Sequence, residues 1–274
     1  MNTRKSVVKK QGKATAAVKP STLKEPEATL SSMYRKLSRA WGKQHWWPAE
    51  TPFEVIVGAI LTQNTSWTNV ERAIASLRVA GILSVEGIRE VPQPKLEELI
   101  RSSGYFRQKA QRLKNFVAFL DARCGGSLER MFAAPTWRLR ADLLALNGIG
   151  PETADSILLY AGNHATFVVD AYTRRILERH EAVGAGAKYD EIRSLAERAL
   201  QRVRPLAPFF DSSTGERRPK THSPSAMSTT RRSPLTQIYN EMHGLLVQVG
   251  KHYCHKTEPK CEACPLGSML RKSN

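Results

Sequence analysis

The stretch from Leu143 to Leu177 constrains the fold of this chain more than any other. One apolar helical face ends with leucines at positions 143, 144 and 146. A second apolar face, also at helical spacing, runs from Ala154 to Ala161. Only a few residues separate the two, among them Gly148-Ile149-Gly150. Glycine allows a sharp turn because it adopts positive φ without steric cost. The pattern predicts two helices joined by a very tight turn.

Such a turn leaves free backbone N–H groups at the start of the second helix. These donors and the helix dipole stabilise an anion, so the turn is suited to grip a phosphate. Pro151 fits the first helical position, where its missing N–H costs nothing. An ordinary pair of antiparallel helices has the same local pattern, so the turn alone leaves both interpretations open.

The sequence that follows the turn narrows the choice. An apolar pair, Val168-Val169, leads into Asp170 at the start of another predicted helix. With L-x-G-I-G-x-x-T-A from Leu146 through Thr153 to Ala154, this resembles the endonuclease III superfamily of DNA glycosylases. The resemblance covers roughly residues 46–264 apart from one polar insertion. It implies that Gly148, Ile149, Gly150 and Thr153 contact DNA.

Charge supports a polyanionic partner. The 274 residues carry a net charge of +17, with a pI near 10.0. The segments 1–27 and 205–234 contribute +5 and +3 of this, which leaves +9 on the remainder. A basic folded part fits DNA, RNA or an acidic membrane surface.

The chain shows no signal-peptide pattern before Met33, and its longest apolar run, from Phe53 to Leu61, is too short to span a bilayer. We therefore expect a cytoplasmic, nucleoid-associated protein without a membrane partner, and a monomer. Cys124 is expected to be structural.

The remaining pattern predicts an all-α helix bundle, with two helical subdomains flanking a cleft. At 41% hydrophobic residues the chain can bury a sizeable core. Helices are expected near 30–41, 53–61, 66–79, 93–102, 106–122, 137–146, 171–180, 189–203 and 235–253. We expect a disordered basic arm at 1–27, a terminal subdomain from 28–52 and 164–253, a bundle at 53–163 and a cysteine loop and tail at 254–274. Within the terminal subdomain, residues 205–234 are expected to be a disordered insertion.

Asp170 is the candidate catalytic carboxylate. Cleavage of an N-glycosidic bond builds positive charge on the sugar, which an ionised carboxylate stabilises, and the same group can orient or deprotonate water. A plain helix N-cap explains Asp170 equally well from local sequence, because Thr173 follows three residues later. The family resemblance favours catalysis, and one residue can fill both roles.

Glu152 occupies the position at which bifunctional members of the superfamily carry a nucleophilic lysine. A carboxylate cannot form a Schiff base, so β-lyase chemistry by that route is excluded. The simpler interpretation of Glu152 is an acid that favours the helix dipole. The resemblance thus implies a monofunctional glycosylase.

The segments around His45–Pro48, Leu61–Trp67 and Ser103–Ala110 are most similar to the 3-methyladenine branch of the superfamily. In that branch, residues that match Trp46, Pro48 and Trp67 wall the base pocket. Cationic alkylated purines suit stacked indoles, and they leave as neutral bases without a general acid. The alternative is that these aromatic residues are core or helix-end residues. At one position this chain departs from the pattern of that branch: where the branch carries a lysine, this chain has Leu245.

Gln63 and Asn64 match the superfamily's residues that fill the gap left by an extruded nucleotide. Their simpler role is to cap two helix ends. Cys254, Cys261 and Cys264 match three thiolates of the family's 4Fe–4S loop. The fourth cysteine would fall at position 270, which is Leu270. A cluster is therefore suspected, while His252 or His255 as a ligand, a three-iron cluster, zinc or a vestigial loop stay open.

The sequence thus predicts a base excision glycosylase that acts on damaged, alkylated bases in double-stranded DNA. Two alternatives stay open. One is an endonuclease III-like enzyme for oxidised or deaminated bases, and the other is a non-catalytic module that binds damaged DNA.

Overall fold

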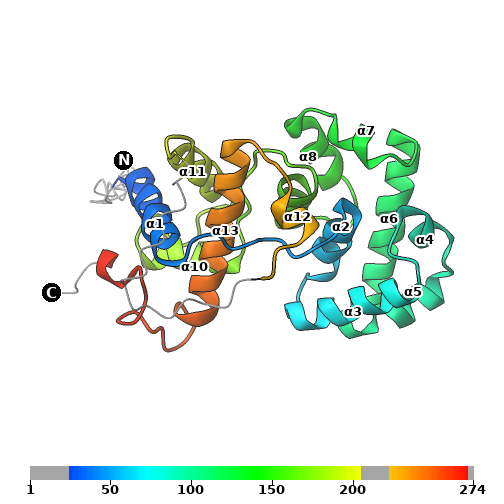
Figure 1. Cartoon of the computed structure of the whole chain (residues 1–274), viewed down its shortest axis with the longest axis horizontal. Helices are drawn as coiled ribbons and strands as arrows, with labels where there is room; N and C mark the ends of the chain where they lie inside the picture. The colour runs from blue at the N-terminus through cyan, green and yellow to red at the C-terminus, as the bar shows by residue number, and fades with distance from the viewer. Residues whose placement is uncertain (1–24, 205–221, 271–274) are drawn as a thin grey trace, which may run out of the picture.

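The structure is a computed structural model that describes residues 25–204 and 222–270, and all regular elements in those ranges are helical (Figure 1). This confirms the predicted all-α fold. None of these helices is long and apolar enough to cross a bilayer. The α-helices are α1 (Pro26–Trp41), α2 (Pro52–Leu61), α3 (Trp67–Val79), α4 (Val85–Glu90), α5 (Gln93–Leu99), α6 (Phe106–Cys124), α7 (Leu128–Phe132), α8 (Thr136–Leu144), α9 (Pro151–Ser156), α10 (Ala171–Arg179), α11 (Tyr189–Gln201), α12 (Ala226–Thr229) and α13 (Pro234–His252). Shorter helical turns are η1 (Arg101–Ser103), the π-helical η2 (Ile157–Ala161) and η4 (Gly267–Met269).

Helix α13 is the central element of one side of the molecule. Nearly all of its residues from Thr236 to Gly250 are buried. It packs against α1, α10, α11 and η2, and Figure 1 shows α1, α10 and α11 gathered around it. Helices α3 to α8 lie on the other side (Figure 1).

Helix α2 is the apolar helix at the centre of the second group. The Thr51 side chain caps it by accepting a hydrogen bond from the Glu54 amide at 3.1 Å, and Pro52 occupies the first turn. Phe53 and the residues that follow it in α2 are buried, against α3, α6, α9 and η2. An apolar surface on every side of a helix requires such central placement.

The linker between α1 and α2 crosses α13 at close range. The backbone N–H of Gln44 donates a hydrogen bond to the Glu241 carboxylate at 2.9 Å. A Cβ atom at Gly244 would lie 3.1 Å from the Cβ atoms of both Gln44 and Trp46, tighter than most contacts of that kind. Glycine at this position of α13 therefore lets the linker, and Trp46 with it, lie directly on the helix.

A buried ion pair joins α8, α9 and α11. The Asp155 side chain is fully buried and accepts two hydrogen bonds from Arg140, at 2.7 and 3.1 Å. Arg140 also pairs with Asp190 at 2.9 Å. Nearby, the Glu197 carboxylate accepts a hydrogen bond from the Phe167 amide at 3.0 Å. These contacts hold the extended segment that leads to α10.

The structure corrects part of the predicted disordered insertion. Residues 222–234 form α12 and the approach to α13, and Met227 is 5% exposed. Backbone hydrogen bonding from the Met227 amide to the Ala49 carbonyl, at 3.0 Å, fixes this segment on the linker. Burial of Met227 and this hydrogen bond order a polar stretch that composition alone marks as loop. Helix α1 likewise begins at Pro26, inside the predicted arm, whereas residues 1–24 and 205–221 lie outside the described residues.

We expect Asp155→Ala to lower the free energy of unfolding by roughly 3 kcal/mol, because it leaves the buried Arg140 guanidinium without its main partner. Urea unfolding followed by circular dichroism measures the loss. Asp121→Ala is the matched control, since Asp121 pairs with Arg89 at the surface and contributes less. Equal losses in the two variants would contradict a structural role for the buried pair.

Candidate active site

The predicted hairpin joins α8 to α9. Gly148 has φ of 83°, in the left-handed region that favours glycine. A Cβ atom there would lie 2.1 Å from Arg112 Nε, so the position also lacks room for a side chain. Ile149 is 5% exposed, which fixes the turn to the core, and α9 begins at Pro151 as expected.

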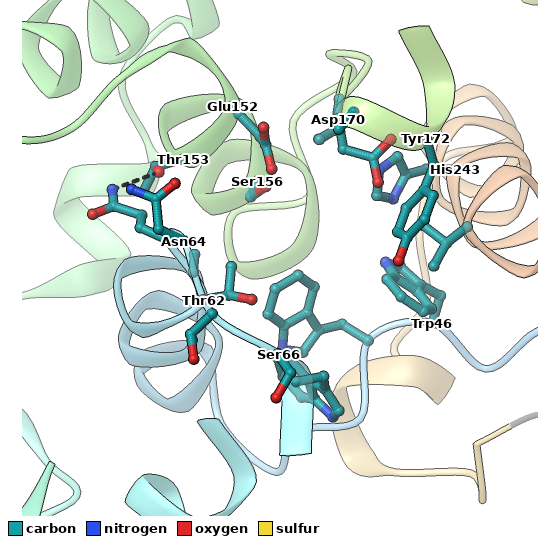
Figure 2. A pocket seen from close by; sticks show the side chains of 18 of the residues that line it. Trp46, Thr62, Asn64, Ser66, Glu152, Thr153, Ser156, Asp170, Tyr172 and His243 are labelled. Atoms are coloured by element: carbon teal, nitrogen blue, oxygen red, sulfur yellow. Dashed lines mark hydrogen bonds and ion pairs between the residues drawn. The ribbon is translucent and has the colours of Figure 1, made fainter. Parts of the chain in front are cut away.

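A cleft of about 790 Å³ opens beside this hairpin. Its walls come from the α1–α2 linker, the loop between α2 and α3, α9, the start of α10, and α13 (Figure 2). Seven of the predicted site residues line it: Trp46, Gln63, Asn64, Trp67, Gly148, Thr153 and Asp170. Pro48, Ile149 and Gly150 are not part of its lining.

Asp170 is both an N-cap and a cleft residue. One carboxylate oxygen accepts a hydrogen bond from the Thr173 amide at 2.7 Å, which starts α10. The other lies 3.6 Å from His243 Nε2. Burial on its own would raise the pKa of Asp170, but the His243 imidazole and the bonds from Thr173 outweigh it and hold the pKa below the usual value. The carboxylate is therefore ionised at neutral pH.

His243 and Tyr160 extend this arrangement, and the sequence patterns did not single them out. Both are buried, and the Tyr160 hydroxyl lies 2.5 Å from His243 Nδ1. Burial raises the pKa of Tyr160 well above 10, so its hydroxyl keeps the proton. With Nδ1 bonded to that hydroxyl, His243 presents Nε2 to Asp170 (Figure 2). Only three-dimensional packing brings α13 and η2 together here.

Three indoles line one end of the cleft. Trp47 is buried and meets Trp46 and Trp67 edge-on, at centroid distances of 6.1 and 5.0 Å. Trp67 is fixed by a 2.9 Å hydrogen bond from Nε1 to Glu71. Trp46 and Trp67 are each only partly buried. Both therefore offer aromatic surface to the cleft, with Trp47 as the buried support between them.

Gln63 is tied to the hairpin. Its Nε2 donates to the Gly148 carbonyl and to Thr153 Oγ1, both at 2.9 Å, and its Oε1 accepts from Arg112. Asn64 follows with φ of 54° and is exposed. The structure thus brings the predicted gap-filling loop and the predicted phosphate-binding turn into direct contact.

A buried lysine, which the sequence patterns also missed, supports that loop. Lys109 Nζ donates to the carbonyls of Leu61 and Ser103, at 2.8 and 2.6 Å. Burial, assisted by the charge of Arg112, lowers the pKa of Lys109 to about 8. Through this amine the end of α2 is joined to the turn that presents Tyr105, an aromatic side chain that is 65% exposed.

Comparison with known proteins identifies the family. Residues 57–202 match the family described as HhH-GPD superfamily base excision DNA repair protein. The chain belongs to the HhH-GPD superfamily. A relative from Methanocaldococcus jannaschii, which carries a provisional name as a DNA repair glycosylase, is 42% identical over 86% of this chain and 93% of its own length.

Solved structures of the superfamily share the fold. The Helicobacter pylori 3-methyladenine DNA glycosylase, crystallised with 1,N6-ethenoadenine, is 28% identical and has a TM-score of 0.63, over 83% of this chain and 97% of its own. An endonuclease III trapped in a covalent complex with DNA has a TM-score of 0.62 at 19% identity, over 89% and 92% of the two chains. The second likeness concerns the fold alone. As an HhH-GPD protein, the chain is of the DNA glycosylase type of base excision repair.

Glu152 faces the same cleft as Asp170 in this HhH-GPD protein (Figure 2). It stands in the first turn of α9 and is exposed to the cleft. The surrounding walls raise the pKa of Glu152 to about 7, and the charge of Asp170 adds to the rise, whereas His243 opposes it. The two cleft carboxyls therefore titrate far apart.

The cysteines of this HhH-GPD protein do not fit a four-thiolate cluster. Leu270 holds the fourth position, and Cys254 Sγ accepts a hydrogen bond from Arg179 at 2.9 Å. Arg175 donates to the Cys254 carbonyl at 2.7 Å. In residues 25–204 and 222–270, no three His, Cys, Asp or Glu side chains are placed to hold a metal. Arg175 and Arg179, both on α10, fix the start of this loop through Cys254.

We expect protein purified anaerobically to lack the iron–sulfur absorbance near roughly 400 nm. Leu270→Cys supplies the missing thiolate, and after reconstitution with iron and sulfide this variant is expected to gain more of that absorbance than the unaltered chain. Iron and labile sulfide assays measure both proteins. Stoichiometric iron and sulfide in the unaltered chain would show that the three thiols suffice with another ligand.

Proposed function

We propose that the chain hydrolyses the N-glycosidic bond of alkylated purines in double-stranded DNA, as a monofunctional glycosylase. The observation that carries this proposal is an ionised carboxylate, Asp170, in a cleft walled by indoles and bordered by the hairpin. Glu152 at the lysine position of bifunctional relatives supports the monofunctional part.

The chemistry at Asp170 follows from charge. As the bond between C1′ and the base nitrogen breaks, positive charge develops on the deoxyribose, and a carboxylate beneath it stabilises the transition state. The same carboxylate can orient the attacking water and take its proton. Since Thr173 and His243 hold the group in one orientation, little reorganisation is needed when the charge appears.

The indoles suit an extruded purine. Trp46 and Trp67 are partly exposed to the cleft, and stacking on aromatic faces favours flat, electron-poor or cationic bases. The ethenoadenine complex of the H. pylori relative supports a purine adduct as the ligand class. Lys251 Nζ already lies 5.9 Å from the Trp46 ring centroid, so a cationic base would compete with this ammonium group for Trp46.

DNA would be held from two sides. The hairpin around Gly148 and Gly150 suits a backbone phosphate, and Gln63 suits the space vacated by the flipped nucleotide. Gln63 is hydrogen-bonded to Gly148 and Thr153 in the free protein, so filling the gap requires exchange of those bonds. The exposed Tyr105 beside this loop suits the same purpose, because apolar wedges keep a kinked step open.

We expect Asp170→Asn to lower the release of 7-methylguanine from duplex DNA at least about 100-fold, because the neutral amide no longer stabilises the sugar cation. A panel of alkylated, oxidised and deaminated lesions, assayed by chromatography of free base, measures this. Binding to a duplex with an abasic-site analogue should persist. Asp121→Asn, outside the cleft, is the matched control.

Two outcomes of that panel would overturn the substrate assignment. Release confined to oxidised or deaminated bases would favour the endonuclease III-like alternative. Binding without release of any base would identify a non-catalytic module.

Sodium borohydride should trap no covalent complex with the unaltered chain, because position 152 carries no amine. Glu152→Lys is expected to introduce trapping, and strand cleavage by β-elimination, if the cleft places C1′ beside this residue. Gel electrophoresis of labelled DNA measures both. Efficient trapping by the unaltered chain, lost in Lys251→Gln, would instead assign an amine on α13 and refute the monofunctional mechanism.

A further inference from the structure

The cleft contains two carboxyl groups that differ in their contacts. Asp170 is held by the Thr173 amide and faces His243. Glu152 makes no hydrogen bond or ion pair within the described part of the chain, and it is exposed to the cleft. Figure 2 shows Glu152 on the α9 wall, across from Asp170 and His243. One carboxyl is fixed and the other is free to move toward a ligand.

The charges that face Glu152 come from several elements. Asp170, at the start of α10, disfavours its ionised form, whereas His243 on α13 favours it. Arg112 on α6 and Lys251 on α13 also line the cleft. Glu152 in turn contributes to the raised pKa of the buried phenols Tyr160 and Tyr189. Desolvation by the cleft walls is the largest influence and raises the pKa of Glu152 to about 7, so the protonated form is populated near neutral pH.

Pairs of titratable groups whose surroundings separate their pKa values divide acid and base work in hydrolases. In the proposed mechanism Asp170, the group with the lowered pKa, faces the sugar on which positive charge develops. Glu152, whose pKa is raised, lies on the opposite wall (Figure 2). An acid on the wall opposite Asp170 is useful only when the leaving base must gain a proton.

We propose that Glu152 is a general acid that protonates an uncharged purine adduct as it leaves, so that the enzyme acts on neutral adducts as well as on cationic alkylated bases. This inference rests on the proposed glycosylase function. Glu152 would then act beside the glycosidic bond, within reach of C1′ and of a ring nitrogen of the base, whereas Asp170 stabilises the sugar cation.

The step balances as an ordinary hydrolysis. The Glu152 carboxyl gives its proton to a ring nitrogen of the adduct, and the C1′–N9 bond breaks with its electron pair retained by the base. Water adds its oxygen to C1′, and its proton passes to Asp170 and then to solvent. Glu152 regains a proton from solvent. A cationic 7-methylguanine already carries the charge that protonation would supply, so its release needs no acid.

The pH dependence has a definite sign. Glu152 acts in its protonated form, so the rate for a neutral adduct should be highest below pH about 7 and fall about tenfold per pH unit above it. Asp170 must be ionised, and its lowered pKa moves the acid limb to lower pH. The rate for 7-methylguanine should lack the alkaline fall in this range.

The test uses the full chain and two duplexes, one with 1,N6-ethenoadenine and one with 7-methylguanine, under single-turnover conditions. Glu152→Gln keeps the shape and hydrogen-bonding capacity of the side chain but removes the transferable proton. We expect it to lower ethenoadenine release about 100-fold. The loss for 7-methylguanine should be smaller, so the ratio of the two rates should fall at least about tenfold. Glu152→Asp should recover part of the ethenoadenine rate, and Glu90→Gln, an exposed acid outside the cleft, is the control.

Each outcome decides the matter. A lowered ratio, with the alkaline limb absent in Glu152→Gln and restored in Glu152→Asp, supports the general acid. Equal losses on both lesions would reduce Glu152 to a structural or DNA-positioning group, and no release of ethenoadenine by the unaltered chain would also overturn the inference. Failure to release either base would refute the proposed function itself. Thermal unfolding of each variant separates loss of fold from loss of chemistry.

Discussion

The hydrogen bond from the Thr173 amide to the Asp170 carboxylate is the contact on which the site depends. It begins α10, fixes the carboxylate in the cleft and helps to keep it ionised. Glu197 positions the backbone that precedes Asp170 by accepting a hydrogen bond from the Phe167 amide. His243, on the buried helix α13, faces the second oxygen of the Asp170 carboxylate. In the proposed mechanism the N-cap of α10 is also the catalytic carboxylate, so a helix terminus supplies the negative charge that stabilises the sugar cation.

The cleft separates two chemically similar residues by their environment. Asp170 has donors and a neighbouring imidazole, whereas Glu152 has cleft walls and a neighbouring negative charge. From the sequence, Glu152 is notable because bifunctional relatives have a lysine at this position. The cleft walls raise the pKa of this carboxyl to about 7, so in the proposed mechanism the residue that stands in place of the lysine also serves as an acid.

Much of the fold was readable from the chain because its signals are local. Helical periodicity predicted the long helices, and the two glycines with Pro151 predicted the hairpin. Helices α4, α7 and α12 are too short to show a period, and burial of Met227 orders a segment that composition marks as loop. His243, Tyr160 and Lys109 were missed because their roles depend on which distant element lies opposite them. The resemblance placed Pro48 in the pocket wall, but Trp47 lines the cleft and Pro48 does not.

The most direct test of the central claim is a crystal structure of Asp170→Asn bound to a duplex that contains 1,N6-ethenoadenine. We predict an extruded nucleotide with its C1′ beside residue 170, its base against Trp46 and Trp67, and a flanking phosphate on the amides of the Gly148–Gly150 turn. A bound duplex whose adduct stays stacked, or whose extruded base lies away from residue 170, would contradict the account.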